Sequence, residues 1–251
     1  MFQNFYIKPG FGGEGLKLKT RTKICGIRTP EEIELADLYG ADAVGFITEV
    51  PIESPRRLDS STAAYLVSSV PQTLSAVLVI MPENSDTAVK LIEKVNPDIV
   101  QIHSELPLLE LEIIKEKTNI PIIKTLFVPL HGKTTGEKTL YMNSVSSLFE
   151  KVNLLEETEV VDSILLDTAK SGKPGGTGCV HDWTLSRRIS EQTRLPLILA
   201  GGLKPENVQE AIRAVSPYAV DTASGVETSG KKDAMKIKSF IEKVRCADAF
   251  L

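Results

Sequence analysis

Short hydrophobic runs alternate along the chain with segments whose hydrophobic residues recur every three or four positions. The runs are predicted to be strands and the periodic segments to be helices. Strands that are hydrophobic on both faces are typical of a parallel sheet covered by helices. The predicted strands cover residues 21–25, 41–47, 74–80, 98–103, 121–126, 160–167, 195–200 and 218–221. The predicted helices cover residues 30–39, 60–70, 84–95, 107–117, 144–157, 182–193, 205–215 and 232–244.

Eight strand–helix units over residues 21–251 predict an α/β fold, a (β/α)8 TIM barrel in a single domain. A doubly wound open sheet is the alternative for the same order of elements. It is less favoured because the first strand is not followed by the glycine fingerprint of a dinucleotide-binding turn. Residues 1–20 contain several Gly and Lys residues without a clear period, and they are predicted to be an N-terminal extension.

Several helix ends are marked by their capping residues. Thr29 and Pro30 fit the N-cap and first position of one helix, and Gly40 fits its C-terminal cap. Asp182 fits the N-cap of another helix. Residues 129–143 are polar and are predicted to form a long loop.

Charge and cysteine content narrow the function classes. The 251 residues carry a formal net charge of -4, and the basic residues are scattered, which argues against a nucleic-acid-binding protein. No hydrophobic run approaches the roughly 20 residues needed to cross a bilayer. The first residues do not resemble a secretory signal. Three widely spaced cysteines suggest neither a disulfide framework nor a zinc site, so a cytoplasmic location is expected.

Reactive side chains follow the predicted strands, where the ends of barrel strands converge on one rim. Cys25, His103 and Asp167 end three strands, and Arg56 follows a fourth. Each also has an ordinary structural interpretation, such as a buried thiol, a hydrogen-bonded core histidine or a solvated arginine. The loops after the last three strands contain Gly175, Gly176 and Gly178, then Gly201 and Gly202, then Ser224 and Gly225. Such loops suit a phosphate group, because their N–H groups are free and glycine leaves room for it.

In these segments the chain resembles the phosphoribosylanthranilate isomerase family of tryptophan biosynthesis. The resemblance covers roughly residues 22–245. The motifs that carry it are KICGI at 23–27, GADAVGF at 40–46, SPR at 54–56, VQIH at 100–103, LLDT at 165–168, GGTG at 175–178, DW at 182–183, GGLKPENV at 201–208, VD at 220–221 and SGVE at 224–227.

The resemblance implies an Amadori rearrangement of N-(5'-phosphoribosyl)anthranilate to 1-(2-carboxyphenylamino)-1-deoxyribulose 5-phosphate. It implies that Cys25 is the general base, that Asp167 is the general acid, and that Arg56 binds the anthranilate carboxylate, with Arg57 as the alternative. It implies no cofactor and no metal. The residues expected to bind substrate are Arg56, His103, Gly176, Thr177, Gly178, Gly201, Gly202, Ser224 and Gly225.

The acid and the base need pKa shifts in opposite directions. The reaction opens a sugar ring, which needs a protonated acid, and removes a proton from C2, which needs an ionised base. We therefore expect the pKa of Asp167 to lie above its ordinary value of about 3.9 and that of Cys25 below about 8.5.

Some positions depart from the family pattern. Ser104 stands where Gly is usual, His181 where Phe is usual, and Ala223 where Ser is common. The segment 129–158 is longer than its counterpart. A monomer or a homodimer is expected, with possible contacts to other tryptophan-pathway enzymes.

The same residues are compatible with other functions. The alternatives are another phosphate-binding barrel enzyme, such as an indoleglycerol phosphate synthase relative, an epimerase or an aldolase, and a non-catalytic sugar-phosphate-binding protein. An aldolase would need a Schiff-base lysine, for which only Lys124 is suitably placed. A metal-dependent epimerase would need clustered ligands, but His103, His131 and His181 are dispersed along the chain.

Overall fold

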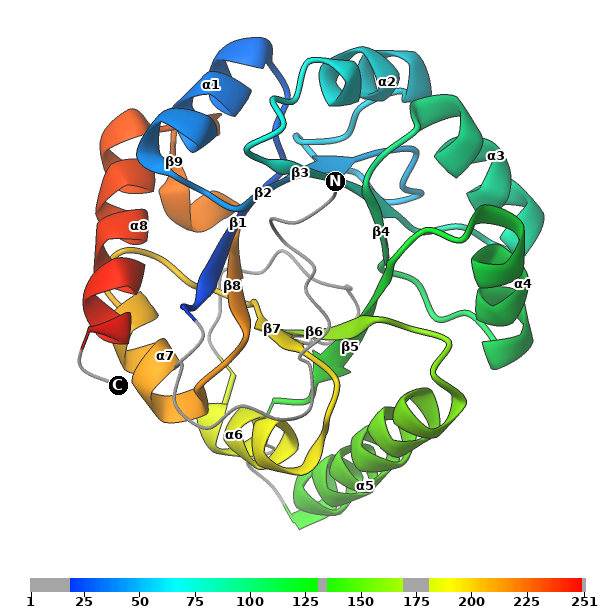
Figure 1. The fold of residues 1–251 in the computed structure, drawn as a ribbon. Coiled ribbons are helices and arrows are strands. Elements are labelled where there is room, and N and C mark those ends of the chain that lie inside the picture. The colour runs from blue at the N-terminus through cyan, green and yellow to red at the C-terminus, as the bar shows by residue number, and fades with distance from the viewer. Residues whose placement is uncertain (1–18, 131–134, 169–180, 250–251) are drawn as a thin grey trace, which may run out of the picture.

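A computed structural model of the chain describes residues 19–130, 135–168 and 181–249. Eight parallel strands, β1 to β8, pair in sequence order, and β8 pairs with β1 to close a barrel that the helices surround (Figure 1). The closed ring confirms the predicted barrel and excludes the open sheet. The barrel strands are β1 Arg21–Cys25, β2 Ala43–Ile47, β3 Ser75–Ile80, β4 Ile99–Ile102, β5 Ile122–Val128, β6 Ser163–Thr168, β7 Leu197–Leu199 and β8 Ala219–Thr222.

The connections are helical except after β8. There the chain forms a short 3-10 turn, η1, and an antiparallel strand pair, β9 and β10, before the closing helix. The helices are α1 Pro30–Tyr39, α2 Ser60–Ser68, α3 Ser85–Val95, α4 Leu108–Thr118, α5 Thr135–Thr158, α6 Trp183–Gln192, α7 Val208–Val215 and α8 Ala234–Asp248. The short elements are η1 Ser224–Val226, β9 Glu227–Thr228 and β10 Lys231–Lys232.

The helix ends largely follow the capping residues. Thr29 accepts a hydrogen bond from the Glu32 backbone N–H, and Gly40 ends α1 with φ of 80°. Asp182 accepts one from the Thr184 backbone N–H at the start of α6. The loop predicted over 129–143 was wrong in its second half, because α5 already begins at Thr135.

The physical reason lies in how α5 packs. The predicted part of α5 buries Val145, Leu148 and Val152, whereas Leu140 and Met142 in its earlier turns are 67% and 60% exposed. Hydrophobic periodicity detects only the turns that pack against the core. Among the described side chains before Val145, Tyr141 alone packs partly against the core, so the pattern did not show these turns.

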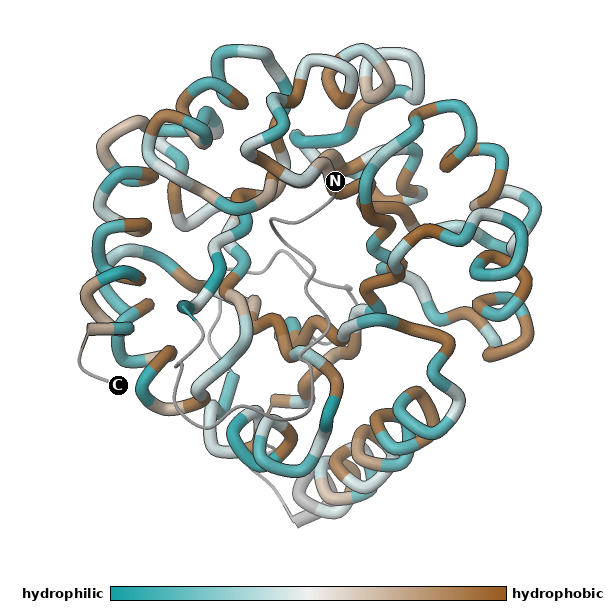
Figure 2. The backbone as a smooth tube through the Cα atoms, in the orientation of Figure 1, coloured by the Kyte–Doolittle hydropathy of each residue, from teal (hydrophilic) through white to brown (hydrophobic). Residues whose placement is uncertain are grey.

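Strand side chains alternate between two cores. Ile164 and Leu166 of β6 point outward into the large core between barrel and helices, while Leu165 points into the smaller core inside the barrel. Cys25 of β1 also belongs to the inner core. Figure 2 shows hydrophobic residues concentrated along the strands and on the helices that cover them. Alternation therefore decides which polar side chains of a strand enter the barrel.

Three aspartates tie neighbouring strands together at the N-terminal end of the barrel. Each lies just before an even-numbered strand and accepts a hydrogen bond from a backbone N–H of the odd-numbered strand before it. Such bonds satisfy backbone donors that the barrel ladder leaves free. The pairs are Thr22 N–Asp42 at 2.8 Å, Ala76 N–Asp98 at 2.7 Å and Ile122 N–Asp162 at 2.8 Å.

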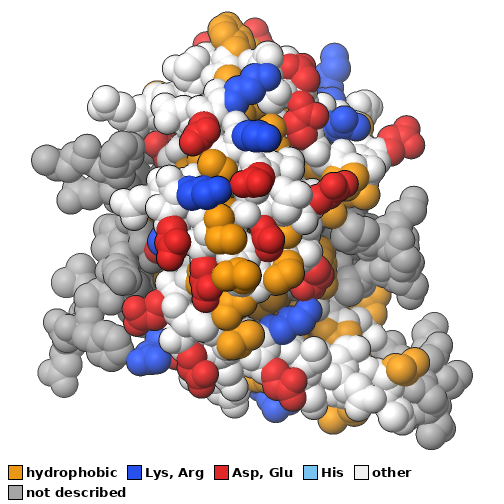
Figure 3. All heavy atoms as spheres, turned by 90° about the vertical axis from the view of Figure 1, so that its right-hand side faces the viewer, with side chains coloured by type: hydrophobic (Ala, Val, Ile, Leu, Met, Phe, Trp, Pro, Cys, Tyr) orange, Lys and Arg blue, Asp and Glu red, His pale blue; other side chains and the backbone are white. Residues whose placement is uncertain are grey.

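The outer surface carries both signs of charge. On the face that lies at the right of Figure 1, acidic and basic side chains are interspersed with hydrophobic ones (Figure 3). This mixing agrees with the small net charge of -4. Among the described residues, no helix is both long and apolar enough to span a membrane.

The aspartate ties make a prediction about stability. Asp98→Ala should lower the free energy of unfolding by about 1–3 kcal/mol, because a backbone N–H loses its partner. It should leave activity unchanged, since Asp98 lies at the end of the barrel away from the strand tips. Urea unfolding checks this, with Asp86→Ala as control. Asp86 is exposed and pairs with Lys117 at the surface, so its loss should cost less than about 1 kcal/mol. Equal losses in the two variants would contradict the role of the ties.

Candidate active site

A cavity of about 540 Å³ opens at the C-terminal ends of the barrel strands. Four of the side chains predicted from strand ends contribute to its wall, and so do the glycines after β7 and β8. The site therefore lies where barrel enzymes carry their chemistry. The predicted residues that line it are Cys25, Arg56, His103, Asp167, Gly201, Gly202, Ser224 and Gly225. Gly176, Thr177 and Gly178 lie outside the described residues.

Cys25 ends β1 and points into the barrel, where only 6% of the residue is exposed. Burial raises the pKa of its thiol, and the attraction of the Lys23 ammonium lowers it by less. The expectation of a lowered pKa was therefore wrong for the unliganded site. The physical reason is that removing a thiolate from water outweighs one nearby positive charge.

Asp167 lies on the other side of the cavity. It occupies β6, which is separated from β1 by β7 and β8, and 9% of the residue is exposed. Its Oδ1 accepts a hydrogen bond of 2.7 Å from the Thr168 backbone N–H. Gly201 closes this side, since a Cβ there would lie 2.3 Å from Thr168 Oγ1 and 3.2 Å from Asp167 Oδ1. The thiol and the carboxyl thus approach one bound molecule from different sides.

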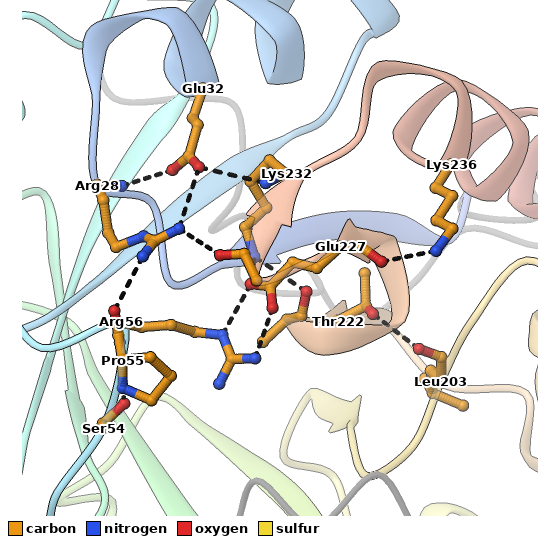
Figure 4. A network of polar contacts seen from close by, with 12 residues as sticks. Arg28, Glu32, Ser54, Pro55, Arg56, Leu203, Thr222, Glu227, Lys232 and Lys236 are labelled. Atoms are coloured by element: carbon orange, nitrogen blue, oxygen red, sulfur yellow. Dashed lines mark hydrogen bonds and ion pairs between the residues drawn. The ribbon is translucent and has the colours of Figure 1, made fainter.

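Arg56 is held by a carboxylate that the sequence did not identify. Arg56 Nε and Nη2 donate to the two oxygens of Glu227 at 2.8 and 2.6 Å, and the remaining nitrogen points away from Glu227 (Figure 4). Lys232 Nζ donates to Glu227 at 2.8 Å. Burial alone raises the pKa of Glu227, but these hydrogen bonds and charges outweigh it and lower the pKa to about 2. The guanidinium is therefore fixed in orientation and keeps one nitrogen for another acceptor.

Two neighbours show why Arg56 rather than Arg57 faces the cavity. Gly26 has a φ of 76°, and a Cβ there would lie 2.4 Å from Arg56 Cδ, so only glycine lets the arginine stem pass. The Arg57 side chain is half exposed and lies 3.9 Å from Glu49, outside the cavity wall. The arrangement favours Arg56 as the arginine that meets a ligand.

His103 is a neutral residue in this site. Burial, with smaller effects from Lys124 and Lys23, lowers its pKa to about 4. Gln101 Nε2 donates to Thr125 Oγ1 at 3.1 Å, and His103 Nδ1 lies 3.2 Å from the same oxygen. The Thr125 hydroxyl thus lies within hydrogen-bond distance of both side chains and holds the imidazole in one orientation.

The glycine loops after β7 and β8 are tied to each other. Gly201 and Gly202 have φ of 85° and 66°, a region that favours glycine. A Cβ on Gly225 would lie 1.9 Å from the Leu203 carbonyl oxygen, which also accepts a hydrogen bond of 2.7 Å from Thr222 (Figure 4). At Gly225 the glycine therefore serves the close approach of two loops, and the expectation that this loop binds phosphate stays a prediction.

Comparison with known proteins agrees with this geometry. A model of the N-(5'phosphoribosyl)anthranilate (PRA) isomerase family matches residues 22–243. The chain is 67% identical over 235 residues to N-(5'-phosphoribosyl)anthranilate isomerase of Methanosarcina acetivorans, covering 94% of this chain and 97% of that protein. The chain belongs to the N-(5'-phosphoribosyl)anthranilate isomerase family.

Solved structures of isomerases from this family have the same fold. The phosphoribosyl anthranilate isomerase of Thermococcus kodakaraensis is 33% identical, with a TM-score of 0.73, over 90% of this chain and 99% of that one. Another phosphoribosyl anthranilate isomerase, in complex with reduced 1-(o-carboxyphenylamino)-1-deoxyribulose 5-phosphate, is 32% identical, with a TM-score of 0.71 and the same coverage of both chains. The alternative barrel enzymes and the non-catalytic binder are thereby set aside in favour of the isomerase family.

Residues considered for other chemistries have structural roles in this isomerase fold. Lys124 points out of the barrel and donates to the carbonyl oxygens of Ser104 and Thr125, both at 2.9 Å. His181 is buried between Thr168 and Ser186, with ring nitrogens 3.0 and 2.6 Å from their hydroxyl oxygens. Within the described ranges, no group of His, Cys, Asp and Glu residues could hold a metal ion.

The structure adds polar residues that sequence reasoning missed. Lys23 and Asp221 form an ion pair below Cys25, and Gln101 supports His103. A polar residue inside a hydrophobic run is costly to bury, and this signal could have identified Lys23 and Gln101. No comparable signal marks Glu227 and Lys232, because their contact depends on the hairpin of β9 and β10.

The cluster around Glu227 predicts a pH dependence of stability in this isomerase fold. The pKa of Glu227 is about 2 in the folded chain and about 4.3 in an unfolded chain, so its stabilising effect is complete above the higher value. That effect is lost as the pH falls toward 2. Glu227→Gln should therefore be less stable than the native chain at neutral pH and lose less stability between about pH 5 and pH 3.

Urea unfolding at several pH values checks this prediction. Glu49→Gln is the matched control, because Glu49 lies 3.9 Å from a half-exposed arginine and its pair is more accessible to water. Its stability should follow the native pH profile. Parallel profiles for the native chain and Glu227→Gln would contradict the assigned pKa.

Proposed function

We propose that the cavity catalyses the Amadori rearrangement of N-(5'-phosphoribosyl)anthranilate, with Cys25 as general base and Asp167 as general acid. The observation that carries this proposal is the meeting of a thiol and a carboxyl, from β1 and β6, across one cavity at the strand tips. A sugar-phosphate isomerisation of this kind needs one group that donates a proton and one that removes a proton. Membership of the isomerase family supports the same reaction.

The first step opens the furanose ring. Protonated Asp167 donates its proton to the ring oxygen as the bond between that oxygen and C1 breaks. The nitrogen lone pair forms a double bond to C1, so the substrate becomes an iminium ion and Asp167 a carboxylate. Positioning of the acid at the leaving oxygen is what lowers the barrier to this step.

The second step moves the C2 proton. The Cys25 thiolate takes it, the C2–H electrons form the C1–C2 double bond, and the iminium electrons return to nitrogen. The resulting enol tautomerises to the C2 ketone as C1 gains a proton from water and the enol oxygen gives its proton to water. Product and substrate are isomers, and the proton on Cys25 must return to Asp167 through water before the next turnover.

Arg56 and the glycine loops orient the two ends of the substrate. The nitrogen of Arg56 that Glu227 leaves free faces the anthranilate carboxylate, and its charge suits that group. The loops at Gly201, Gly202 and Ser224 bind the phosphate with backbone N–H groups, as does the segment 176–178. The neutral His103 forms a hydrogen bond with the substrate. Binding energy from both ends then fixes the sugar between acid and base.

The proposal includes the location and the oligomeric state of the protein. A cytoplasmic location fits the reducing conditions that a reactive thiol needs. We infer a monomer or a homodimer that contacts other tryptophan-pathway enzymes. Size-exclusion chromatography of the purified chain with light scattering would measure the assembly.

The activity can be tested by mixing the purified protein with freshly made phosphoribosylanthranilate. Loss of anthranilate-type fluorescence should occur with the protein and not without it. Cys25→Ser should fold normally and lose about 10²–10⁴-fold in kcat, because a serine hydroxyl is a much weaker acid than a thiol and is not ionised. Cys246→Ser is the control, since Cys246 is exposed and far from the cavity wall. Near-native kcat in Cys25→Ser would exclude Cys25 as the base.

Arg56 makes a prediction about specificity. Arg56→Met should weaken inhibition by a carboxylate-bearing product analogue at least tenfold and leave inhibition by ribose 5-phosphate within about twofold, since a thioether cannot pair with a carboxylate. Arg57→Met is the matched control and should change neither constant, because Arg57 lies outside the cavity wall. Equal weakening of both inhibitors by Arg56→Met would assign Arg56 to the phosphate or to the fold.

A further inference from the structure

A lysine lies fully buried inside the barrel, in the layer below the proposed base. Lys23 precedes Cys25 by two positions on β1, so both side chains point inward, and Lys23 has no exposed surface. Lysine is almost never fully buried without a partner. Its Nζ lies 3.0 Å from Asp221 Oδ1, on the adjacent strand β8, where the two residues pair in register.

The ammonium also lies close to the thiol of Cys25, because both side chains point inward from β1 and both border Gly45. The positive charge of Lys23 lowers the pKa of the Cys25 thiol, against the larger effect of burial. Gly45 on the adjacent strand β2 provides the space for this contact. A Cβ on Gly45 would lie 2.9 Å from Cys25 Sγ and 3.0 Å from Lys23 Nζ, so any side chain there would push the sulfur and the ammonium aside.

A purely stabilising role does not account for this arrangement. A buried ion pair loses the hydration of both charges, and hydrophobic residues of similar size often replace such pairs without loss of stability. The hydrophobic residues of the inner core include Ala43, Val77 and Ala219. What the pair provides that hydrophobic residues cannot is a fixed positive charge beside one particular sulfur.

We propose that Lys23, held by Asp221, is the counter-ion of the Cys25 thiolate and positions its sulfur for proton removal. The inference rests on the proposed role of Cys25 as base. Lys23 acts through the sulfur and does not touch the substrate, so it is a positioning residue. Asp221 keeps the ammonium in place on the opposite side, and it also lines the cavity.

The charges around the sulfur support this role. Burial lowers the pKa of Lys23, but the opposing effects of Asp221 and Cys25 are larger and raise it above its ordinary value. Burial raises the pKa of Cys25, and Lys23 exerts the strongest opposing effect. Among the described residues, three other charged groups act on the sulfur, namely Asp221, Lys232 and Arg56. Glu227 forms ion pairs with Arg56 and Lys232.

The experiment measures the ionisation of Cys25 directly. In a Cys179→Ser/Cys246→Ser background Cys25 is the remaining cysteine, and its rate of alkylation by iodoacetamide is followed against pH by intact mass. Lys23→Met should raise the midpoint by at least about one pH unit, which is about tenfold less thiolate at neutral pH. The value of kcat/KM at pH 7 should fall at least about threefold, because the more basic thiolate recovers part of the tenfold loss of active form, while inhibition by inorganic phosphate stays within about twofold.

Lys124→Met is the matched control. Lys124 is also buried in a barrel strand, but it points outward to two backbone carbonyl oxygens. Its replacement should lower stability and leave the thiol midpoint unchanged. Lys23→Met/Asp221→Asn removes both charges of the inner pair, so it leaves no unpaired carboxylate if Lys23→Met alone does not fold. It too should raise the midpoint.

A measurement on the native fold completes the test. The Lys23 Nζ resonance, in protein labelled with 15N at lysine Nζ, should shift at the thiol midpoint, and this step should disappear in Cys25→Ala. An unchanged midpoint in the double variant, or no step in the lysine resonance, would overturn the proposal. Failure of the isomerase assignment is separate, because it shows in the activity of Cys25→Ser and not in these titrations.

Discussion

The structure depends on one constraint, the alternation of side chains along strands that close into a ring. In an open sheet, the inward positions of β1 and β8 would lie at different places along the sheet. Closure makes these strands neighbours and brings Lys23 within 3.0 Å of Asp221, although 198 positions separate them in the chain. Because the interior is narrow, every polar residue placed there must find its partner there as well. The buried ion pair and the cavity above it are both consequences of closure.

The rim follows a different rule, since its residues lie on loops. A loop arginine has many rotamers, and holding it for a ligand costs conformational entropy. Glu227 accepts hydrogen bonds from two nitrogens of Arg56, so the arginine is already ordered before a ligand binds. Lys232 donates to Glu227 and holds that carboxylate in place. The hairpin of β9 and β10 thereby gives a loop side chain the orientation that a barrel strand gives to Cys25 and Asp167.

The sequence was sufficient for the parts of the fold that depend on local pattern. Hydrophobic runs located the strands, and Thr29, Gly40 and Asp182 marked helix ends because capping depends on residues close in sequence. The first turns of α5 were missed because their described side chains are mostly exposed, with Tyr141 alone packed partly against the core. Strand ends predicted Cys25 and Asp167, whereas the partners of Arg56 and Cys25 depend on contacts between distant segments. Burial, which set the direction of the Cys25 pKa, is also a property of the closed barrel and not of one strand.

The direction of that pKa explains why a cation beside the sulfur matters. The proposed active form has its proton on Asp167 and none on Cys25, and the inactive form with the proton on Cys25 contains the same number of protons. Their ratio therefore depends on the difference between the two pKa values and not on pH. Each unit by which burial raises the thiol pKa reduces the active fraction about tenfold. The thiolate becomes more basic, but the rate of proton removal rises by less than that factor, because the proton is only partly transferred in the transition state. Burial alone would thus slow the reaction, and a fixed ammonium within the barrel opposes that loss while the sulfur stays buried.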